Sequence, residues 1–500
     1  MTKRRQQTAP PRLSKTRFLS GLQCLKRLYL ECFQPELATP AIETEQAVLD
    51  VGKKVEEFAR KRFSGGVLID DSQFDVSAAA EETEKMLSQG QIKALFQGAF
   101  VHEDVVVRTD ILERVTGNRF DLIEVKSGSS VKEVHEPDVA VQLHVLRGAG
   151  LDIRKVFLLH LNTGYVYQGG DYNLEELFTL EDLTEIAEGW QEDVFQGLSE
   201  MRKCLSAEEV PDIPIGDQCS SPHPCPFYGH CNQNPLEHPI SELPRARQEL
   251  LDRLEEAGIE EIKEIPQGFP GLSPLQERVR DVVASGKPFF DPQIRKELQK
   301  AIHPIHFVDF ETFNPALPLF QGTHPYSVIP FQWSDHIMAE DRRVEHYEFL
   351  HDSTNDPRPA FIESLLNVLG DKGSIVVYSP YEATILKALA RDFPRHERGL
   401  LLLLDRILDL LPLVRNNVYH PDFHGSFSIK AVLPALCGTS YGGLEITDGM
   451  QAAVCYAEMI GSETEQARRD EIRKSLAEYC ARDTEAMRLL LGRLSGADSL

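Results

Sequence analysis

The sequence contains no apolar run long enough to cross a membrane. Its richest hydrophobic stretch, residues 400–413, is interrupted by Asp405, Arg406 and Asp409, whereas a spanning helix needs about 20 mostly apolar residues. The basic residues 1–7 are followed by no hydrophobic signal core, which secretion would require. We therefore expect a cytoplasmic protein that makes no membrane contact.

Paired cysteines and an excess of basic residues are also missing. The nine cysteines are an odd number, so without a secretion signal a disulfide framework explains them poorly. The formal net charge of −25 argues against a surface coated for nucleic-acid binding. A nucleic-acid enzyme remains compatible with it, because metal-binding carboxylates belong in such a site and basic residues need only line a groove. Basic residues cluster at 3–27 and 53–62, although a solvated tail and a solvated helix face explain these clusters equally well.

The composition is that of a globular protein with more than one domain. Hydrophobic residues make up 42% and charged residues 26% of 500 residues, a length that favours two or three domains. The order of expected strands and helices predicts a mixed α/β fold. The polar segment 236–300, punctuated by proline and glycine, is a reasonable boundary. We therefore predict a domain over 1–235, a helical connector over 236–300 and a second domain over 301–500.

Residues 105–126 carry candidate catalytic residues of the first half. Two β-rich runs flank a turn at 116–118 and predict a hairpin, and alternation on its second strand places Glu124 and Lys126 on one face. Asp110 lies on the first strand. Two acids and an amine so placed can hold a divalent metal and position a water beside it, which is the chemistry of phosphodiester hydrolysis.

The elements expected around this hairpin complete the first α/β domain. They are a helix that begins at the N-cap Ser14 and contains Cys24, a helix over 45–63, short strands at 67–69 and 100–107, a helix over 138–146 that carries Gln142, a strand over 155–161 and one acidic helix over 175–204.

A second group of candidate ligands consists of cysteines. Three of them, each separated from the next by five residues, lie in a rigid proline-rich loop: Cys219, Cys225 and Cys231. A metal bound there would need a fourth ligand, for which Cys24 is the candidate and His223 or His230 the alternative. Three other cysteines lie among apolar positions and are interpreted as core residues: Cys437, Cys455 and Cys480.

The second half also carries pairs of site candidates on its predicted strands and helices. A strand over 304–312 places Asp309 and Glu311 on one face, and Tyr479 and Asp483 lie four residues apart on one face of a C-terminal helix. A strand followed by a helix over 374–390 carries Glu382, and Asp409 is the alternative to it. Each acid alone is more often a surface residue; the ordered set on these elements is what favours a site.

The first half resembles the RecB-like branch of the PD-(D/E)XK nucleases, and in particular its iron–sulfur members of the CRISPR-associated and AddB type. The residues that carry this resemblance are Cys24, Asp110, Glu124, Lys126, Gln142, Cys219, Cys225 and Cys231. The resemblance implies a [4Fe-4S] cluster on the four cysteines. Their spacing is wider than the tightest family pattern, so Zn²⁺ on the same four sulfurs is the alternative.

The resemblance also assigns roles in the first half. Asp110 and Glu124 would bind Mg²⁺ or Mn²⁺, Lys126 would orient water or stabilise charge on the phosphate, and Gln142 would position the strand or the substrate. Two positions depart from the family pattern. Glu56 stands at or near the place of a metal-binding histidine, and the tyrosine of the Gln-x-x-x-Tyr pattern is replaced by Leu146.

The second half resembles the DnaQ-like, RNase H-fold exonucleases of the DEDD type that carry a tyrosine. This implies two metal ions held by four acids, with Tyr479 helping to hold the attacking water: Asp309, Glu311, Glu382 and Asp483. Glu382 stands where the family usually has aspartate, and Asp409 is the alternative for that position.

Together the halves resemble bacterial fusions of a RecB-like nuclease with a DnaQ-like domain. We expect a metal-dependent nuclease with two centres that acts on DNA, on single strands or 3′ ends. The alternatives are an iron–sulfur nucleic-acid-binding adaptor with one or both sites inactive, and an exonuclease that digests RNA. The sequence leaves open the cleavage polarity of the first site, the protein partners, the oligomeric state and the pathway, whether repair or antiviral defence.

Overall fold

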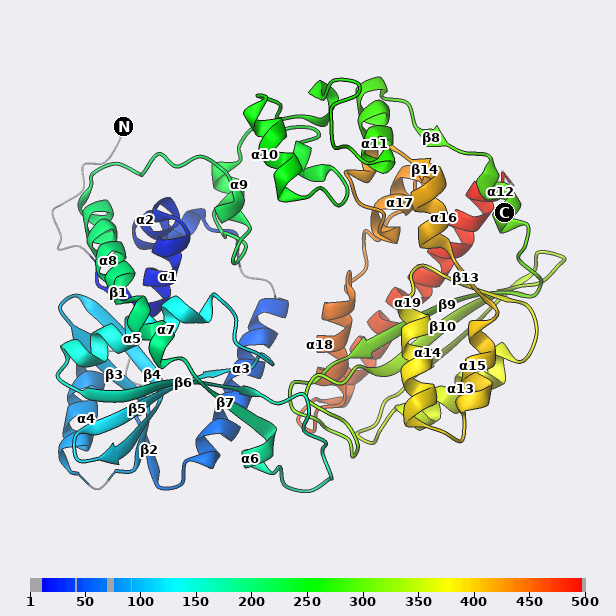
Figure 1. The fold of residues 1–500 in the computed structure, drawn as a ribbon. Helices are drawn as coiled ribbons and strands as arrows, with labels where there is room; N and C mark the ends of the chain where they lie inside the picture. Colours follow the sequence, from blue (N-terminus) through cyan, green and yellow to red (C-terminus); the bar gives the residue numbers. More distant parts are fainter. Residues whose placement is uncertain (1–10, 41–42, 70–75, 91, 497–500) are drawn as a thin grey trace. The chain divides into compact units, whose positions relative to one another are not determined.

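The computed structural model describes residues 11–40, 43–69, 76–90 and 92–496, so residues 3–10 of the first basic cluster lie outside the described residues. The chain divides into two compact units, coloured along the sequence in Figure 1. The first unit comprises Met1–Asn234 and Pro315–Ser327, and the second Pro235–Asn314 and Val328–Leu500. Both units are mixed α/β, as the sequence predicts.

Seven strands of the described chain form one sheet in the first unit. They are β1 (Leu13–Ser14), β2 (Gly66–Leu68), β3 (Ala94–His102), β4 (Val105–Thr116), β5 (Arg119–Lys126), β6 (Asp152–Leu161) and β7 (Phe178–Asp182). Their order is β2-β3-β4-β5-β6-β7, with β1 pairing with β4. The predicted hairpin is confirmed, because β4 and β5 pair antiparallel. On its other edge β5 pairs parallel with β6.

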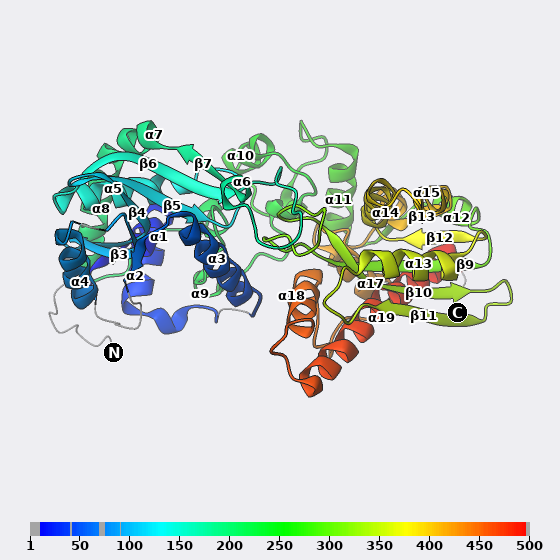
Figure 2. The same ribbon diagram turned by 90° about the horizontal axis from the view of Figure 1, so that it is seen from below.

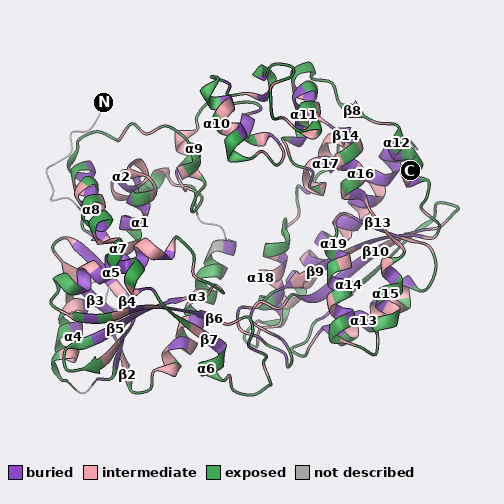
Figure 3. Ribbon diagram, viewed as in Figure 1, coloured by how far each residue is buried: buried purple, intermediate pink, exposed green. Residues whose placement is uncertain are grey.

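Helices cover both faces of this sheet. They are α1 (Lys15–Gln23), α2 (Leu25–Phe33), α3 (Glu43–Arg62), α4 (Val76–Ser88), α5 (His135–Gly148), α6 (Leu174–Leu177), α7 (Thr184–Gly189), α8 (Gln191–Ser206) and α9 (Tyr228–Cys231). Apolar side chains of α1, α2, α5 and α8 share one buried cluster with β5, and those of α3 share another with the opposite face of β5. Figure 3 shows this buried layer in purple.

Alternation along β5 explains the orientation of the candidate site. Leu122 packs in the cluster that contains α5, whereas Ile123 and Val125 pack in the cluster that contains α3. Glu124 and Lys126 share the parity of Leu122 and therefore point toward α5.

The helix predicted from Ser14 is two helices. Ser14 caps α1 as predicted, because its hydroxyl accepts a hydrogen bond from the Arg17 backbone N–H. The predicted continuation through Cys24 is wrong: Cys24 is extended, with φ −164° and ψ 120°, and separates α1 from α2. The periodic leucines on both sides of it conceal the break, since each short helix keeps its own apolar face.

Two other predictions in the first unit are wrong. The strand expected over 100–107 spans the turn between β3 and β4, where Glu103 has a left-handed backbone with φ 55°. The single helix expected over 175–204 contains the strand β7 between α6 and α7. β7 pairs antiparallel with β6, so a non-local strand pairing prevails over the helix propensity of the acidic run.

The second unit contains a five-stranded sheet. The strands of this unit are β8 (Phe289–Phe290), β9 (Ile305–Phe313), β10 (Ile329–Met338), β11 (Val344–Leu350), β12 (Ser374–Val377), β13 (Ile407–Asp409) and β14 (Val418–Tyr419). The five are ordered β11-β10-β9-β12-β13, and β8 pairs with β14 in a separate pair. β9, β10 and β11 are antiparallel neighbours, whereas β12 runs parallel to β9 and β13.

The second unit has helices on the two faces of this sheet and others away from it (Figures 1 and 2). They are α10 (Gln248–Glu256), α11 (Pro274–Ser285), α12 (Gln293–Leu298), α13 (Arg358–Leu369), α14 (Tyr381–Asp392), α15 (Glu397–Leu404), α16 (Leu410–Asn417), α17 (Ile429–Cys437), α18 (Gly449–Met459) and α19 (Gln466–Ser495). Val308 and Phe310 of β9 pack with α13, α14 and α15, whereas Ile305 and Phe307 pack with α19.

The segment expected to be a connector packs into the second unit. Leu250 and Leu254 of α10 and Val279 of α11 belong to the same buried cluster as Phe307 and Tyr419. Residues 235–300 therefore form part of the fold that carries β9. No helix in the described part of the chain is both long and apolar enough to span a membrane.

A glycine fixes this segment against a later loop. Gly425 has φ 74°, and a Cβ atom there would lie 1.9 Å from the carbonyl oxygen of Glu242. We expect Gly425→Ala to lower the free energy of unfolding of the second unit by about 2–3 kcal/mol, because backbone strain adds to the overlap. Urea unfolding in a Trp190→Phe background measures this, since Trp333 then reports on the second unit alone.

The matched control is Gly438→Ala at the end of α17. Gly438 also has a left-handed backbone, with φ 68°, but no atom lies within 4 Å of the added Cβ. Gly438→Ala should lower the free energy of unfolding by only about 1 kcal/mol. Equal losses for the two variants would show that the contact with Glu242 does not constrain the loop.

Candidate functional site

A pocket of about 470 Å³ in the second unit gathers the acids predicted from the second half of the sequence. Its lining includes Asp309 and Glu311 from β9, Glu382 from α14, and Tyr479 and Asp483 from α19. We call it the four-carboxylate pocket. The structure thus brings together residues that lie more than 170 positions apart in the chain.

Local structure positions each of these side chains. Asp309 and Glu311 have the same parity on β9 as Ile305 and Phe307, so they face α19. Tyr479 and Asp483 are one helical turn apart on α19 and face back toward them. Glu382 lies in the first turn of α14, directly after the β12–α14 loop, as the predicted strand-to-helix context requires.

Burial, together with repulsion between the acids, dominates the electrostatics of the four-carboxylate pocket. Burial, followed by the charges of Asp483 and Glu311, raises the pKa of Asp309 well above its usual value. Burial and Asp483 likewise raise the pKa of Glu311, and burial with Asp409 and Asp483 raises the pKa of Glu382 to about 8. Like charges held this closely favour either protons or cations in the pocket.

One oxygen of this set has no partner. Within the described residues, Oε2 of Glu382 is buried and accepts no hydrogen bond. A buried carboxylate oxygen without a donor is costly unless a cation or water satisfies it. The donor set of carboxylate oxygens suits hard cations such as Mg²⁺ and Mn²⁺, so these residues fit the metal sites that the resemblance implies.

Three further residues lie against the site residues of the pocket and carry no sequence signal as site residues. Lys430 Nζ donates to Tyr479 Oη over 3.0 Å, and Tyr441 Oη donates to Asp483 Oδ1 over 2.5 Å. Cys480 Sγ lies 3.7 Å from Asp309 Oδ2, although the sequence places Cys480 among core positions. Lys430 and Tyr441 come from residues 429–448, whose approach to α19 depends on tertiary packing.

The structure distinguishes the two candidates for the second acidic motif. Glu382 lines the pocket. The carboxylate of Asp409 instead accepts a hydrogen bond from the Leu411 backbone N–H over 2.9 Å and caps α16. Geometry therefore favours Glu382 over Asp409.

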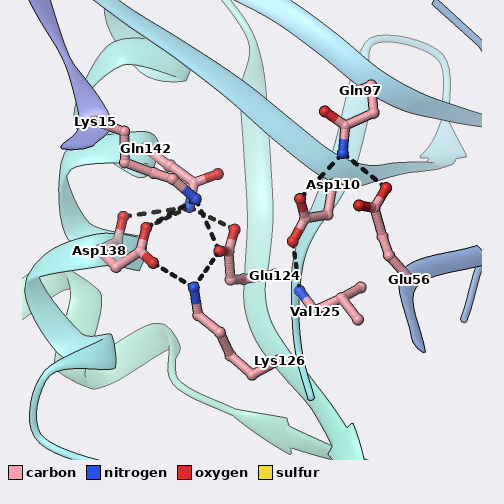
Figure 4. A network of polar contacts seen from close by, with 9 residues as sticks. All are labelled: Lys15, Glu56, Gln97, Asp110, Glu124, Val125, Lys126, Asp138 and Gln142. Carbon is pink, nitrogen blue, oxygen red and sulfur yellow. Dashed lines mark hydrogen bonds and ion pairs between the residues drawn. The ribbon is translucent and has the colours of Figure 1, made fainter. Parts of the chain in front are cut away.

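The first unit brings its predicted residues into two adjoining networks (Figure 4). In one, Glu124 accepts hydrogen bonds from Lys126 Nζ over 2.7 Å and from Gln142 Nε2 over 2.8 Å. Two residues absent from the sequence analysis complete it. Lys15 Nζ lies 2.8 Å from Glu124 Oε1, and Asp138 Oδ2 lies 2.6 Å from Lys126 Nζ.

This network balances its own charges. Lys15 and Lys126 offset the carboxylates of Glu124 and Asp138, with Lys15 contacting Asp138 at 3.1 Å. Although burial favours the neutral acid, Lys126 and Lys15 hold the pKa of Glu124 below its usual range. Burial opposes charge on Lys15 as well, yet Glu124 and Asp138 raise its pKa. As the first residue of a capped helix, Lys15 gives no signal that separates it from an ordinary exposed lysine.

The second network joins Asp110 to Glu56. Gln97 Nε2 donates to Glu56 Oε1 over 2.7 Å and to Asp110 Oδ1 over 3.3 Å, while the Val125 backbone N–H donates to Asp110 Oδ2 over 2.8 Å. Gln97 has a left-handed backbone, with φ 54°, and lies between the paired positions Phe96 with Ile111 and Gly98 with Thr109, so the β3–β4 register is the same on both sides of it.

Asp110 is the less compensated acid of the first unit. Burial and the charge of Glu124 raise the pKa of Asp110 to about 8, and Glu56 adds to the effect. The charges of Glu124 and Glu56 act on Asp110, but the ligand atoms of these three acids do not all lie within 4.8 Å of one another, so a divalent cation would have to draw them together. Glu56 occupies the position at which the sequence pattern places a ligand.

Four cysteines of the first unit line one small cavity of about 20 Å³: Cys24, Cys219, Cys225 and Cys231. His223 and His230 are not among its described lining residues. Gln23 Nε2 donates to the carbonyl oxygens of Gln218 and His223 over 2.6 and 2.7 Å, which holds the late loop against the break at Cys24. No three of these thiols lie within 4.8 Å of one another, so they line a common cavity without being gathered at one ion.

Two sets of described side chains each bring three ligand atoms within 4.8 Å of one another. One is Asp309, Glu311 and Cys480 in the four-carboxylate pocket. The other is His238, Glu242 and His424, in which the two imidazoles lie 3.1 and 3.0 Å from the Glu242 carboxylate. Hydrogen bonds between these three residues already account for the second arrangement.

Repulsion in the four-carboxylate pocket predicts a dependence of stability on pH. The pKa of Glu382 rises from 4.5 to about 8 on folding, so without divalent cations the folded state retains a proton that the unfolded state releases. The free energy of unfolding therefore falls as pH rises between these values. We expect Glu382→Gln to raise Tm by several degrees at pH 8 and less at pH 5, at about 2–4 °C per kcal/mol.

Differential scanning calorimetry in EDTA measures this difference. Glu363→Gln, at an exposed position of α13, is the control and should change Tm equally at both pH values. Mg²⁺ should stabilise the wild type more than Glu382→Gln. A Tm difference that does not grow with pH would show that Glu382 is not held against repulsion.

Comparisons with known proteins cover part of the chain. Residues 306–428 match a family described as a domain of unknown function, DUF2779; this stretch includes Asp309, Glu311 and Glu382 and ends before α19. Among curated proteins none matches. A solved structure titled "Crystal structure of SSO0001" aligns at 13% identity over 46% of this chain and 90% of its own, with a TM-score of 0.20, which is too low to carry an argument.

Proposed function

We propose that this chain is a metal-dependent nuclease with one catalytic centre in each unit, the second of which removes nucleotides from a 3′ end. The convergence of Asp309, Glu311, Glu382 and Asp483 in one buried pocket carries the proposal. Four carboxylates with raised pKa values are costly to the fold unless cations bind there. Two-metal hydrolysis of phosphodiesters is the chemistry that such a set serves.

The strand order of the second unit supports the finer assignment to a DnaQ-like, RNase H-fold exonuclease. Three antiparallel strands followed by two parallel ones, with acids on the central strand β9 and on the last helix, are what the DEDD resemblance leads us to expect. In the first unit, the acids on a β4–β5 hairpin and the amide of α5 are likewise those expected of a RecB-like PD-(D/E)XK domain.

The residues of the four-carboxylate pocket have distinct tasks in this reaction. The bound cations would activate the water and neutralise charge on the phosphate. Tyr479 accepts a hydrogen bond from Lys430 and stays protonated, because burial and the Asp483 and Glu311 charges raise its pKa. It therefore orients the water rather than removing its proton. Water attacks the terminal phosphodiester, the bond to the 3′ oxygen breaks, and a nucleoside 5′-monophosphate leaves.

The first unit presents its residues differently. Asp110 accepts hydrogen bonds from neutral donors alone, Gln97 and the Val125 backbone N–H. Glu56 lies 3.5 Å from Arg60, whereas Glu124 is bound by Lys15, Lys126 and Gln142. For Glu124 to ligate a metal, one lysine must turn toward the phosphate. Lys126, which then stabilises charge developing on the phosphate, is the residue that the PD-(D/E)XK resemblance assigns to this task.

The saturation of Glu124 also favours a second candidate function. With both oxygens of Glu124 hydrogen-bonded and two lysines held beside it, the first unit could bind nucleic acid without cutting it. The chain would then be an adaptor with one active centre, and RNA is an alternative substrate for that centre. Separate inactivation of the two sites distinguishes these functions.

We expect Asp110→Asn and Asp309→Asn each to remove a different set of products from end-labelled single-stranded DNA. Each substitution removes a charge that a cation needs, so the corresponding rate should fall at least about 100-fold. Gel analysis of 5′- and 3′-labelled DNA and RNA in Mg²⁺ or Mn²⁺ resolves the two patterns. EDTA should abolish both.

The control for this experiment is Asp409→Asn, since asparagine keeps the helix cap and Asp409 does not line the pocket. Its products should match those of the wild type. If Asp110→Asn leaves every product in place while Asp309→Asn removes them all, the first unit is the adaptor. Absence of cleavage by the wild type on every substrate and metal would refute the nuclease.

We also propose a metal centre on the four cysteines, with a [4Fe-4S] cluster as the resemblance implies and Zn²⁺ as the alternative. Anaerobically purified protein should contain iron, acid-labile sulfide and a visible absorption band, and Cys219→Ser should lose them. Cys437→Ser, in the second unit, is the control and should retain them. A colourless wild type with one zinc per chain would replace the cluster with Zn²⁺, and a metal-free protein would remove the centre.

A further inference from the structure

A second pocket adjoins the four-carboxylate pocket in the second unit. Its volume is about 480 Å³, and it shares Tyr378, Ser379 and Ile429 with the lining of the first. These three residues come from the β12–α14 loop and the start of α17, which form the common wall. We call it the arginine pocket, after its residues Arg245 and Arg415.

The charges of the two pockets are opposite. The four-carboxylate pocket is acidic, whereas no described residue lining the arginine pocket is an aspartate or glutamate. Neither Arg245 nor Arg415 forms an ion pair with a carboxylate of the described chain. Arginine is the side chain best suited to hold a phosphate, because its planar guanidinium donates two parallel hydrogen bonds.

The other lining of the arginine pocket is largely apolar. Leu275, Leu411 and Phe427 contribute to it, and Tyr378 Oη donates to the Phe427 carbonyl oxygen over 2.9 Å, which fixes the wall shared with the acidic pocket. The Arg415 guanidinium lies 6.0 Å from the centroid of the Phe427 ring. Cationic groups beside an apolar, partly aromatic wall are what single-stranded nucleic-acid sites combine.

The segment before β9 contributes to this pocket. Arg245 and Leu275 belong to residues 235–300, and Arg245 has a left-handed backbone with φ 56°. Gly425 has no side chain, which leaves room for the Glu242 carbonyl oxygen. His424 Nδ1 lies 3.0 Å from Glu242 Oε1, so this segment lies against the loop that leads to Phe427. Packing of the segment into the second unit therefore places a guanidinium beside the candidate catalytic pocket.

We infer that the arginine pocket binds the sugar-phosphate backbone of a single-stranded polynucleotide on the 5′ side of the bond cut in the four-carboxylate pocket. The inference rests on the proposed exonuclease function and names its substrate as a strand of at least two or three nucleotides. A terminal nucleotide in the acidic pocket leaves the remaining strand to continue into the neighbouring one. There Arg245 and Arg415 hold its phosphates.

Binding tests this without turnover. In an Asp483→Asn background with Mg²⁺, fluorescence anisotropy of a 5′-labelled ten-nucleotide oligothymidylate measures affinity at several salt concentrations. We expect Arg245→Glu with Arg415→Glu to weaken binding at least about tenfold for each arginine. The slope of log K against log salt should fall by about 0.7 for each phosphate that an arginine no longer neutralises. Arg395→Glu, at an exposed position after α14, should change neither.

Turnover provides a second readout. The p-nitrophenyl ester of thymidine 5′-monophosphate is one nucleotide long and carries no further phosphate on the 5′ side of the bond that is cut. The ratio of kcat/KM for the oligonucleotide to kcat/KM for this ester should fall at least about tenfold for each arginine replaced, mainly through the KM of the oligonucleotide. Arg245→Gln with Arg415→Gln should show the same trend and guards against a folding defect of the charge reversals.

The outcomes separate the inference from the function on which it rests. The charge-reversed variant could leave the affinity, the salt slope and the ratio of kcat/KM values unchanged. That result would show that the arginine pocket does not bind the strand, and it would leave the nuclease proposal in place. If the wild type hydrolyses neither substrate but the two arginines still control affinity and salt slope, the exonuclease proposal fails and the binding site remains. Loss of binding with Arg395→Glu as well would show an unspecific charge effect and refute the site.

Discussion

Repulsion between buried carboxylates is the interaction on which the second unit depends. β9 carries two acids on the face that meets α19, and α19 presents another at the same depth, so folding the sheet against this helix brings negative charges together. Lys430 is one cation near them, and it offsets only part of that charge. The fold therefore gains its core from the apolar neighbours on β9 and retains at its centre an electrostatic cost that bound cations relieve.

In the first unit, lysine side chains offset the charge of the acids. Lys15 and Lys126 lie among Glu124 and Asp138 so that opposite charges alternate, and Gln142 occupies the remaining oxygen of Glu124. Such a network is nearly neutral without any ion, although its members are buried. The acid left without a lysine partner is Asp110, whose raised pKa sets it apart from Glu124. The two units thus differ in how strongly their folds favour a bound cation.

Sequence periodicity predicted the parts of both sites that depend on a single element. Alternation on one strand was enough for Asp309 with Glu311 and for Glu124 with Lys126, and helical spacing was enough for Tyr479 with Asp483. The apolar neighbours of each pair must be buried, and this fixes which way the strand or helix is turned. The direction of each pair therefore follows from the sequence of its own element.

The rest of the two sites depends on contacts between segments that lie far apart in the sequence. The break at Cys24, the left-handed backbone at Gln97 and the approach of Lys15 to Glu124 follow from how α1, β3 and the late cysteine loop pack together, and no local pattern encodes that packing. The edge strand β7 was hidden for the same reason, since its pairing with β6 overrides an acidic sequence that favours a helix.

The position of Cys480 has a consequence for metal selectivity. Its buried thiol lies against Asp309, and burial with the nearby carboxylates raises the pKa of the thiol well above its usual value, so it remains protonated and contributes nothing to a hard ion such as Mg²⁺. A thiophilic ion such as Zn²⁺ or Cd²⁺ gains by displacing that proton, since sulfur is a ligand these ions prefer. If cations bind this pocket as proposed, a thiophilic metal would therefore compete with magnesium for it.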